Sequence, residues 1–139
     1  MRRLRFIIIN LILLLSSGMA HEVQENTAKV TLRHNTLSLA LSIHPSQWSK
    51  KFTVEKFDDA ILKETKLLIN QKSIALKLRK IEKKSKHYSV LFVSSSAIDS
   101  KIKEVSLALP KELGNIVVTV VQANTKFMHQ GKAIEFVLD

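Results

Sequence analysis

The stretch that decides the fold is residues 28–43, AKVTLRHNTLSLALSI. Apolar and polar residues alternate on both sides of its middle, which is the period-two pattern of strands with one buried face. A two-residue turn at His34-Asn35 places three apolar pairs on one face, and Asn35 tolerates the positive φ that such turns require. These pairs are Leu32–Leu37, Val30–Leu39 and Ala28–Leu41. The stretch therefore predicts a β-hairpin.

Short segments with the same alternation follow along the chain. Turn residues separate them at 70–73, 113–115 and 130–131. The expected strands are 67–69, paired across the first of these turns with 74–78, then 88–93, which we expect to be buried on both faces, 105–109 and 134–138. Residues 116–121 are a continuous β-branched run, typical of a central strand, and the polar residues 21–27 are expected to form an arm.

One helix interrupts the strands. We expect it over about 53–63, because Val54, Phe57, Ile61 and Leu62 form one apolar stripe at helical spacing. Thr53 is the expected N-cap, and Trp48 is expected to pack under the helix. Together with the strands, this pattern predicts an all-β chain, an immunoglobulin-like β-sandwich of about seven or eight strands with one short helix.

The first twenty residues have the composition of an export signal. Three arginines precede the apolar run 6–15, and small residues lead to a cleavage site between Ala20 and His21. The run is shorter than the ~20 residues that a spanning helix needs. We expect a cleaved signal peptide over 1–20, one domain over 21–139, no transmembrane anchor after cleavage, and a periplasmic or secreted location. Retention of the segment as a membrane anchor is the alternative.

The formal charge of the chain is +10, and it contains no cysteine. The missing cysteines exclude a disulfide scaffold, a thiolate zinc site and a cysteine nucleophile. The expected signal peptide removes three arginines and leaves +7, of which the segment 72–87, including Lys72, carries +6. The candidate contact residues in this segment are Lys77, Arg79, Lys80, Lys83, Lys84 and Lys86.

Two interpretations of this lysine-rich segment are open. Lysines on an exposed strand keep a sheet edge from pairing with other chains, and they also offer a docking surface for an anionic partner. In an exported protein that partner is an anionic envelope component, such as lipopolysaccharide phosphate or a lipid headgroup, or an acidic protein. Nucleic acid is not expected, because the segment lacks interleaved aromatic residues. The oligomeric state stays open.

Signatures of enzymes are absent from the sequence. There is no glycine-rich phosphate loop, no nucleophile elbow and no His-Glu-x-x-His helix. The adjacent carboxylates Asp58 and Asp59 are explained by their place near a helix start. We therefore expect a non-enzymatic binding or accessory protein without a cofactor, and a small hydrolase is the weakest alternative.

A copper-binding protein is the main alternative. Cleavage after Ala20 would give His21 a free α-amine beside its imidazole, and nitrogen donors of this kind suit Cu(II). His87 and His129 are the candidates for completing the metal site.

Two resemblances bear on these expectations. Residues 21–26, HEVQEN, running into the VTLR of 30–33, resemble a group of small exported proteobacterial proteins that begin His-Glu. This resemblance implies a periplasmic β-sandwich and no activity. An N-terminal histidine on such a sandwich is also similar to the copper-resistance protein C family, whose motif adds an Asp-x-His near the C-terminal strands. Only His21 and, loosely, His129 correspond, because no Asp-x-His occurs here.

Overall fold

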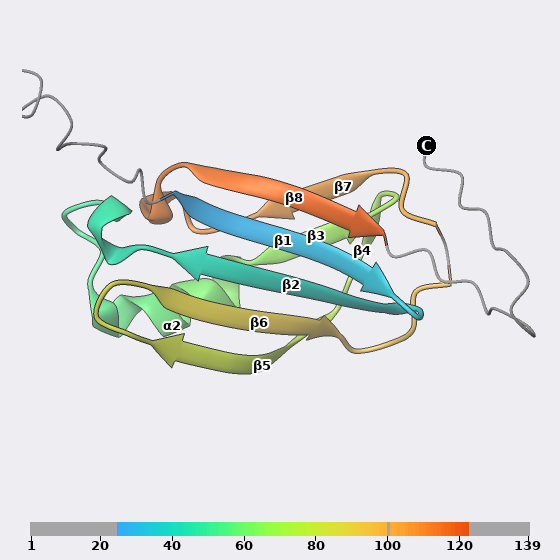
Figure 1. Cartoon of the computed structure of the whole chain (residues 1–139), viewed down its shortest axis with the longest axis horizontal. Coiled ribbons are helices and arrows are strands. Elements are labelled where there is room, and N and C mark those ends of the chain that lie inside the picture. Colours follow the sequence, from blue (N-terminus) through green and yellow to red (C-terminus); the bar gives the residue numbers. More distant parts are fainter. Residues whose placement is uncertain (1–24, 100, 123–139) are drawn as a thin grey trace, which may run out of the picture.

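The computed structural model describes residues 25–99 and 101–122. These residues form two facing β-sheets and one α-helix. The larger sheet has the strand order β5-β6-β2-β1-β8, and the smaller sheet has the order β4-β3-β7 (Figure 1). The elements are β1 (Asn26–Arg33), β2 (Thr36–Ile43), η1 (Pro45–Gln47), α2 (Val54–Glu64), β3 (Lys66–Ile69), β4 (Lys72–Ser73), β5 (Leu76–Lys83), β6 (Tyr88–Ser94), β7 (Val105–Ala108), η2 (Lys111–Leu113) and β8 (Ile116–Gln122). The expected all-β sandwich with one short helix is confirmed.

The β1–β2 hairpin has the predicted register. His34 and Asn35 both have positive φ, 47° and 60°, as the mirror-image hairpin turn requires. All three predicted apolar pairs are observed, and their side chains are buried. β6 continues the same buried face on the other side of β2, because Phe92 lies opposite Leu39 and Val90 opposite Leu41.

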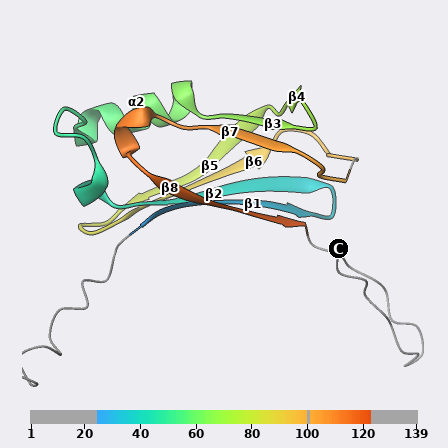
Figure 2. The same ribbon diagram turned by 90° about the horizontal axis from the view of Figure 1, so that it is seen from above.

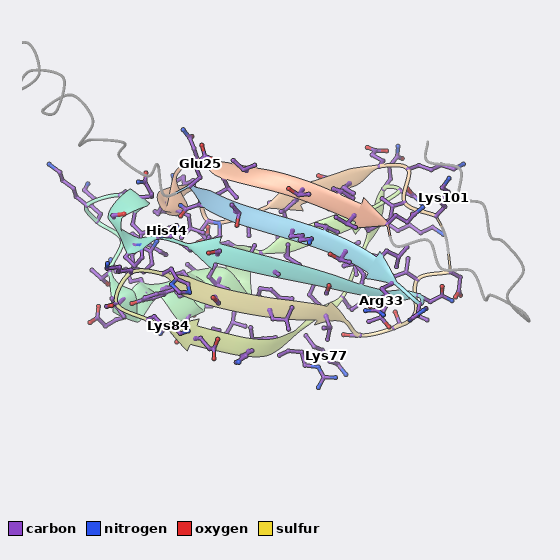
Figure 3. The ribbon with its side chains drawn as sticks, in the orientation of Figure 1. Glu25, Arg33, His44, Lys77, Lys84 and Lys101 are labelled. Carbon is purple, nitrogen blue, oxygen red and sulfur yellow. The ribbon has the colours of Figure 1, made fainter. Side chains whose placement is uncertain are left out.

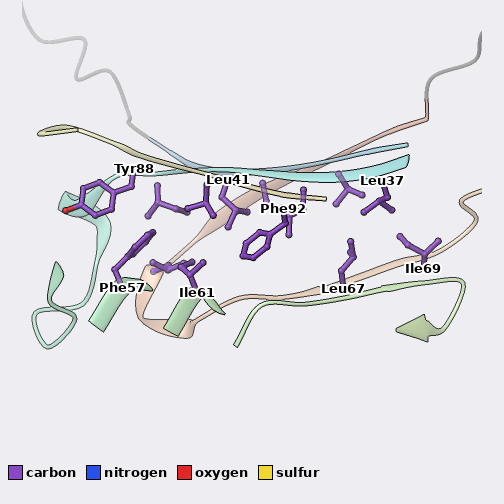
Figure 4. Close-up of a cluster of buried hydrophobic side chains, with 14 of the residues drawn as sticks. Leu37, Leu41, Phe57, Ile61, Leu67, Ile69, Tyr88 and Phe92 are labelled. Carbon is purple, nitrogen blue, oxygen red and sulfur yellow. The ribbon is translucent and has the colours of Figure 1, made fainter. Parts of the chain in front are cut away.

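The smaller sheet and α2 together form the layer opposite the larger sheet (Figure 2). Figure 4 shows the core between the layers, where Phe57 and Ile61 of the helix and Leu67 and Ile69 of β3 point toward the larger sheet. All four side chains are buried. Burial of this kind stabilises a domain by about 25 cal/mol per Å² of apolar surface, so this interlayer contact holds the fold without disulfides.

Trp48 packs under the helix, as expected. Its ring stacks on Phe57 at 5.2 Å between centroids and makes edge contacts with Phe52 and Tyr88. The expected helix stripe is only half right, since Val54 and Leu62 are exposed. The reason is that the larger sheet covers the face containing Phe57 and Ile61, whereas no layer formed by the described residues covers the other sides of α2.

Several expected strands have different partners. β3 pairs with only two residues of β4, and the chain then crosses to the larger sheet, so Leu76 and Leu78 do not pair with β3. β6 is buried on one face only, since Leu91 and Val93 stay half-exposed on the outer face. β8, expected to be central, is an edge strand among the described residues. The expected strand 134–138, the turn at 130–131 and the signal peptide 1–20 lie outside the described residues.

The expected arm is shorter than predicted, because β1 already begins at Asn26. This side chain is fully buried: its Nδ2 donates to the carbonyl of Leu113 (2.6 Å), and its Oδ1 accepts the backbone N–H of His44 (2.7 Å). Nearby, Gly114 has φ +79°, and a Cβ there would lie 2.9 Å from the carbonyl oxygen of Gln47. Asn26 and Gly114 therefore fix the place where β8 begins beside β1.

Candidate functional site

A β-bulge determines which way the side chains of β5 point. Leu78 lies opposite Phe92 and Lys80 opposite Leu91, so Arg79 is an extra residue with no partner of its own. Because of the bulge, Ile81 returns to the core face opposite Val90. Every later residue of β5 is shifted in the same way, and Lys83 arrives on the core side opposite Tyr88.

Lys83 is consequently part of the packing between β5 and α2. Its Nζ lies 2.8 Å from each carboxylate oxygen of Asp58. The same nitrogen is 6.0 Å from the ring centroids of Phe57 and Tyr88, within the range of cation–π attraction. Among the six candidate contact residues, Lys83 is therefore the one whose side chain contributes to the packing of the fold.

The other five candidates form the basic edge, which we define as Lys77, Arg79, Lys80, Lys84 and Lys86. All five are exposed. Lys80 pairs with Glu82 at 2.8 Å, and this hydrogen bond and charge lower the pKa of Glu82, with smaller contributions from Lys84 and His87. Within 25–99 and 101–122, the remaining four side chains pair with no carboxylate. Figure 3 labels Lys77 and Lys84 toward the two ends of the basic edge. Lys72, from the same segment of the sequence, lies on β4 in the smaller sheet.

The positive surface continues across the larger sheet. One row of its outer face runs Lys80, Leu91, Ala40, Lys29 from β5 to β1, a distance of about 14 Å at ordinary strand spacing. Lys29 and Arg33 are both exposed on β1, and Figure 3 shows Arg33 toward the same end of the sheet as Lys77. We call the basic edge together with these two residues the basic face. Lys29 and Arg33 were not among the predicted contact residues, although their alternation with apolar residues in the sequence indicated the outer side of β1.

The centre of the basic face carries no charge. β2 contributes the small side chains of Ser38, Ala40 and Ser42, and the facing residues of β6 are Val93, Leu91 and Ser89. Recesses bordered by described residues lie elsewhere in the molecule. One of about 330 Å³ borders Ile69, Ile74 and Ile98, and one of about 440 Å³ borders α2. The basic face therefore suits contact with a flat anionic surface.

The predicted copper residues are only partly placed by the structure. His87 is half-buried at the start of β6, while His21 and His129 lie outside the described residues. A different histidine is its neighbour: the rings of His44 and His87 are 6.3 Å apart. The β2–β6 pairing sets the end of β2 beside the start of β6 and so brings the two rings together. In 25–99 and 101–122, no group of three histidine, aspartate or glutamate side chains could hold a metal ion.

Comparisons with known proteins give no relative: no family model, no curated protein and no solved structure matches this chain. The described residues also contain no helix of the length and hydrophobicity required to cross a membrane. The two resemblances noted in the sequence stay predictions.

Proposed function

We propose that this chain is an exported, non-enzymatic binding module whose basic face docks on phosphate-bearing lipid headgroups of the cell envelope. The observation that carries the proposal is the distribution of charge on the outer face of the larger sheet. Five exposed cations lie along β5 and the turn that follows it, and two more lie on β1, whereas Glu82 is the one acidic residue in the described strands of the larger sheet. Each lysine or arginine near an anionic membrane contributes about 1 kcal/mol of attraction.

The shape of the surface favours a membrane or a lipopolysaccharide layer, and not a small ligand, as the binding partner. A small ligand is bound in a concave site that surrounds most of its surface, whereas the outer residues of β2 and β6 line none of the recesses described above. A flat layer of phosphates, by contrast, can meet cations at both margins of the face at once. Attraction of this kind weakens with salt, because the Debye length is about 8 Å at physiological ionic strength.

The test is co-sedimentation with vesicles of phosphatidylcholine, with and without phosphatidylglycerol or lipopolysaccharide. The variant reverses the four free cations of the basic edge: Lys77→Glu, Arg79→Glu, Lys84→Glu and Lys86→Glu. Lys83 is left intact, because its ion pair with Asp58 belongs to the packing. We expect the native chain to bind only the anionic vesicles, and the variant to lose at least about 100-fold in partitioning.

The matched control reverses four exposed lysines on the α2 side of the molecule, Lys50, Lys51, Lys56 and Lys111. Both variants have the same net charge, so only the position of the cations differs. Equal losses in the two variants, or equal binding to neutral and anionic vesicles, would reject the basic face as the contact surface. The lipopolysaccharide and phosphatidylglycerol arms distinguish the two sources of phosphate, and capture of an acidic protein without vesicle binding would also reject the proposal.

Copper binding is the second candidate, because two imidazoles lie together. His44 and His87 flank the end of the sandwich where β1 begins, and Asn26 of β1 accepts the backbone N–H of His44. His21 is five residues before Asn26, so a short extended chain of about 15 Å would bring it to this pair. Calorimetry with Cu(II) on a chain beginning at His21 tests this candidate. We expect an N-terminal extension or His87→Ala to weaken binding, and unchanged binding in both would reject the site.

A further inference from the structure

The free edge of β8 is the most conspicuous apolar feature outside the basic face. β8 pairs with β1 on one side, and on its other side it has no strand among the described residues. Its sequence, IVVTVVQ, contains no charged residue. An uncharged, β-branched edge of this kind is a template for pairing with another strand.

Five of the seven residues of β8 are exposed, and part of this exposed surface faces inward. Val118 and Val120 lie beside Ala28 and Val30 of β1, which are 1% and 0% exposed. Only one strand further out, Val118 and Val120 are 48% and 44% exposed, and Val117 on the opposite face is 48% exposed. The inner face of β8 therefore lacks the cover that the inner face of β1 has.

The uncovered valines border an open side of the sandwich. β8 is the last strand of the larger sheet, and β7 is the last strand of the smaller one. Figure 1 shows them along the same long side, and the Gln122 side chain accepts the Ile102 N–H just before β7 (2.6 Å). Val105 and Leu107 of β7 are themselves only half-buried. A strand added to β8 would cover apolar side chains of both sheets at this seam.

We propose that residues 132–138 of the same chain pair antiparallel with the free edge of β8 and close this seam. The segment, KAIEFVL, has the length of β8 and the alternation of a half-buried strand, with Ile134, Phe136 and Leu138 on one side. Those three side chains would cover Val118 and Val120. Residues 123–131 lie between the two strands and give ample length for the return, since hairpin connections commonly take 2–5 residues.

Attachment to β8 is the reason for choosing this segment over a second copy of the chain. A strand tethered by a short loop acts at an effective concentration in the millimolar range, and closing a loop of this length costs little more than closing a shorter one. A second copy would have to reach that concentration in solution. Residues 132–138 are therefore the occupant that we choose for the edge of β8.

Amide hydrogen exchange of the intact chain tests the proposal. Alternate amides of β8 face β1, and the others face the free edge. We expect both sets to be protected in the native chain, and the edge-facing set to exchange about 100-fold faster in Phe136→Asp, which buries a charge in the seam. Glu135→Lys is the matched control, because this residue lies on the other side of the same predicted strand and should leave exchange unchanged.

Two outcomes would overturn the assignment. Edge-facing amides of β8 that exchange as fast as an unfolded chain in the native protein would leave the edge unpaired. Protection that rises with protein concentration would show that a second copy supplies the strand. The amides of Val30 and Leu39 in the core report whether Phe136→Asp is folded. If that variant unfolds, Phe136→Ser provides the same comparison with a smaller perturbation.

Discussion

The two edges of the larger sheet show two ways of keeping a strand from pairing with other proteins. β5 carries four cations in eight residues and a bulge that distorts its backbone, and both devices discourage edge-to-edge pairing. β8 has neither, since it is regular and uncharged. An edge defended by charge stays open to solvent and to an anionic partner, whereas an undefended apolar edge requires a covering strand. The difference agrees with the docking role proposed for β5 and the structural role proposed for β8.

The largest expected effect is at the junction that holds β8. Asn26→Ala removes the side chain that satisfies the Leu113 carbonyl and the His44 N–H in a fully buried position. Leaving two buried backbone groups without partners should lower the free energy of unfolding by about 3 kcal/mol. Urea denaturation measures the loss, with the exposed neighbour Thr27→Ala as a control that should change stability by less than about 0.5 kcal/mol. A loss below about 1 kcal/mol would show that water replaces both bonds.

The contrast between the edges was only partly predictable from sequence. The β1–β2 register followed from local alternation and a two-residue turn, and it was correct. The position of β8 in the sheet was not predictable, because a run of β-branched residues is equally typical of a central strand and of an edge strand that another strand covers. The lysine cluster was found, yet the bulge at Arg79 depends on the pairing with β6. Without the strand pairing, the sequence did not show that Lys83 lies on the core side of β5. It also did not show that Lys29 and Arg33 of β1 lie in the same sheet as the lysines of β5.

An intermediate effect separates Lys83, the last residue of β5, from Lys84, which follows it. Lys83→Met keeps the apolar stem but removes the ion pair with Asp58 and the attraction to the rings of Phe57 and Tyr88. Because the pair is partly exposed, we expect a loss of about 1 kcal/mol in the free energy of unfolding, and little change in vesicle partitioning. Lys84→Met should do the reverse, with unchanged stability and weaker partitioning. Identical behaviour of the two variants in both measurements would contradict the division of roles along β5.

The smallest expected effect concerns Glu82, the acidic residue that pairs with Lys80 of the basic face. The hydrogen bond and charge of Lys80 lower the pKa of Glu82, so the folded chain binds this proton less readily than the unfolded chain does. The stabilisation is therefore present above the unfolded pKa of about 4.3 and is lost as the pH falls through the lowered folded value. In an NMR titration, Lys80→Met should raise the Glu82 midpoint, whereas Lys77→Met, which removes a cation without this contact, should leave it nearly in place. Equal shifts in both variants would mean that the total charge of β5, and not the hydrogen bond to Lys80, sets the pKa of Glu82. The lysines of the basic edge would then contribute to the electrostatic potential equally, with no single lysine having a distinct effect.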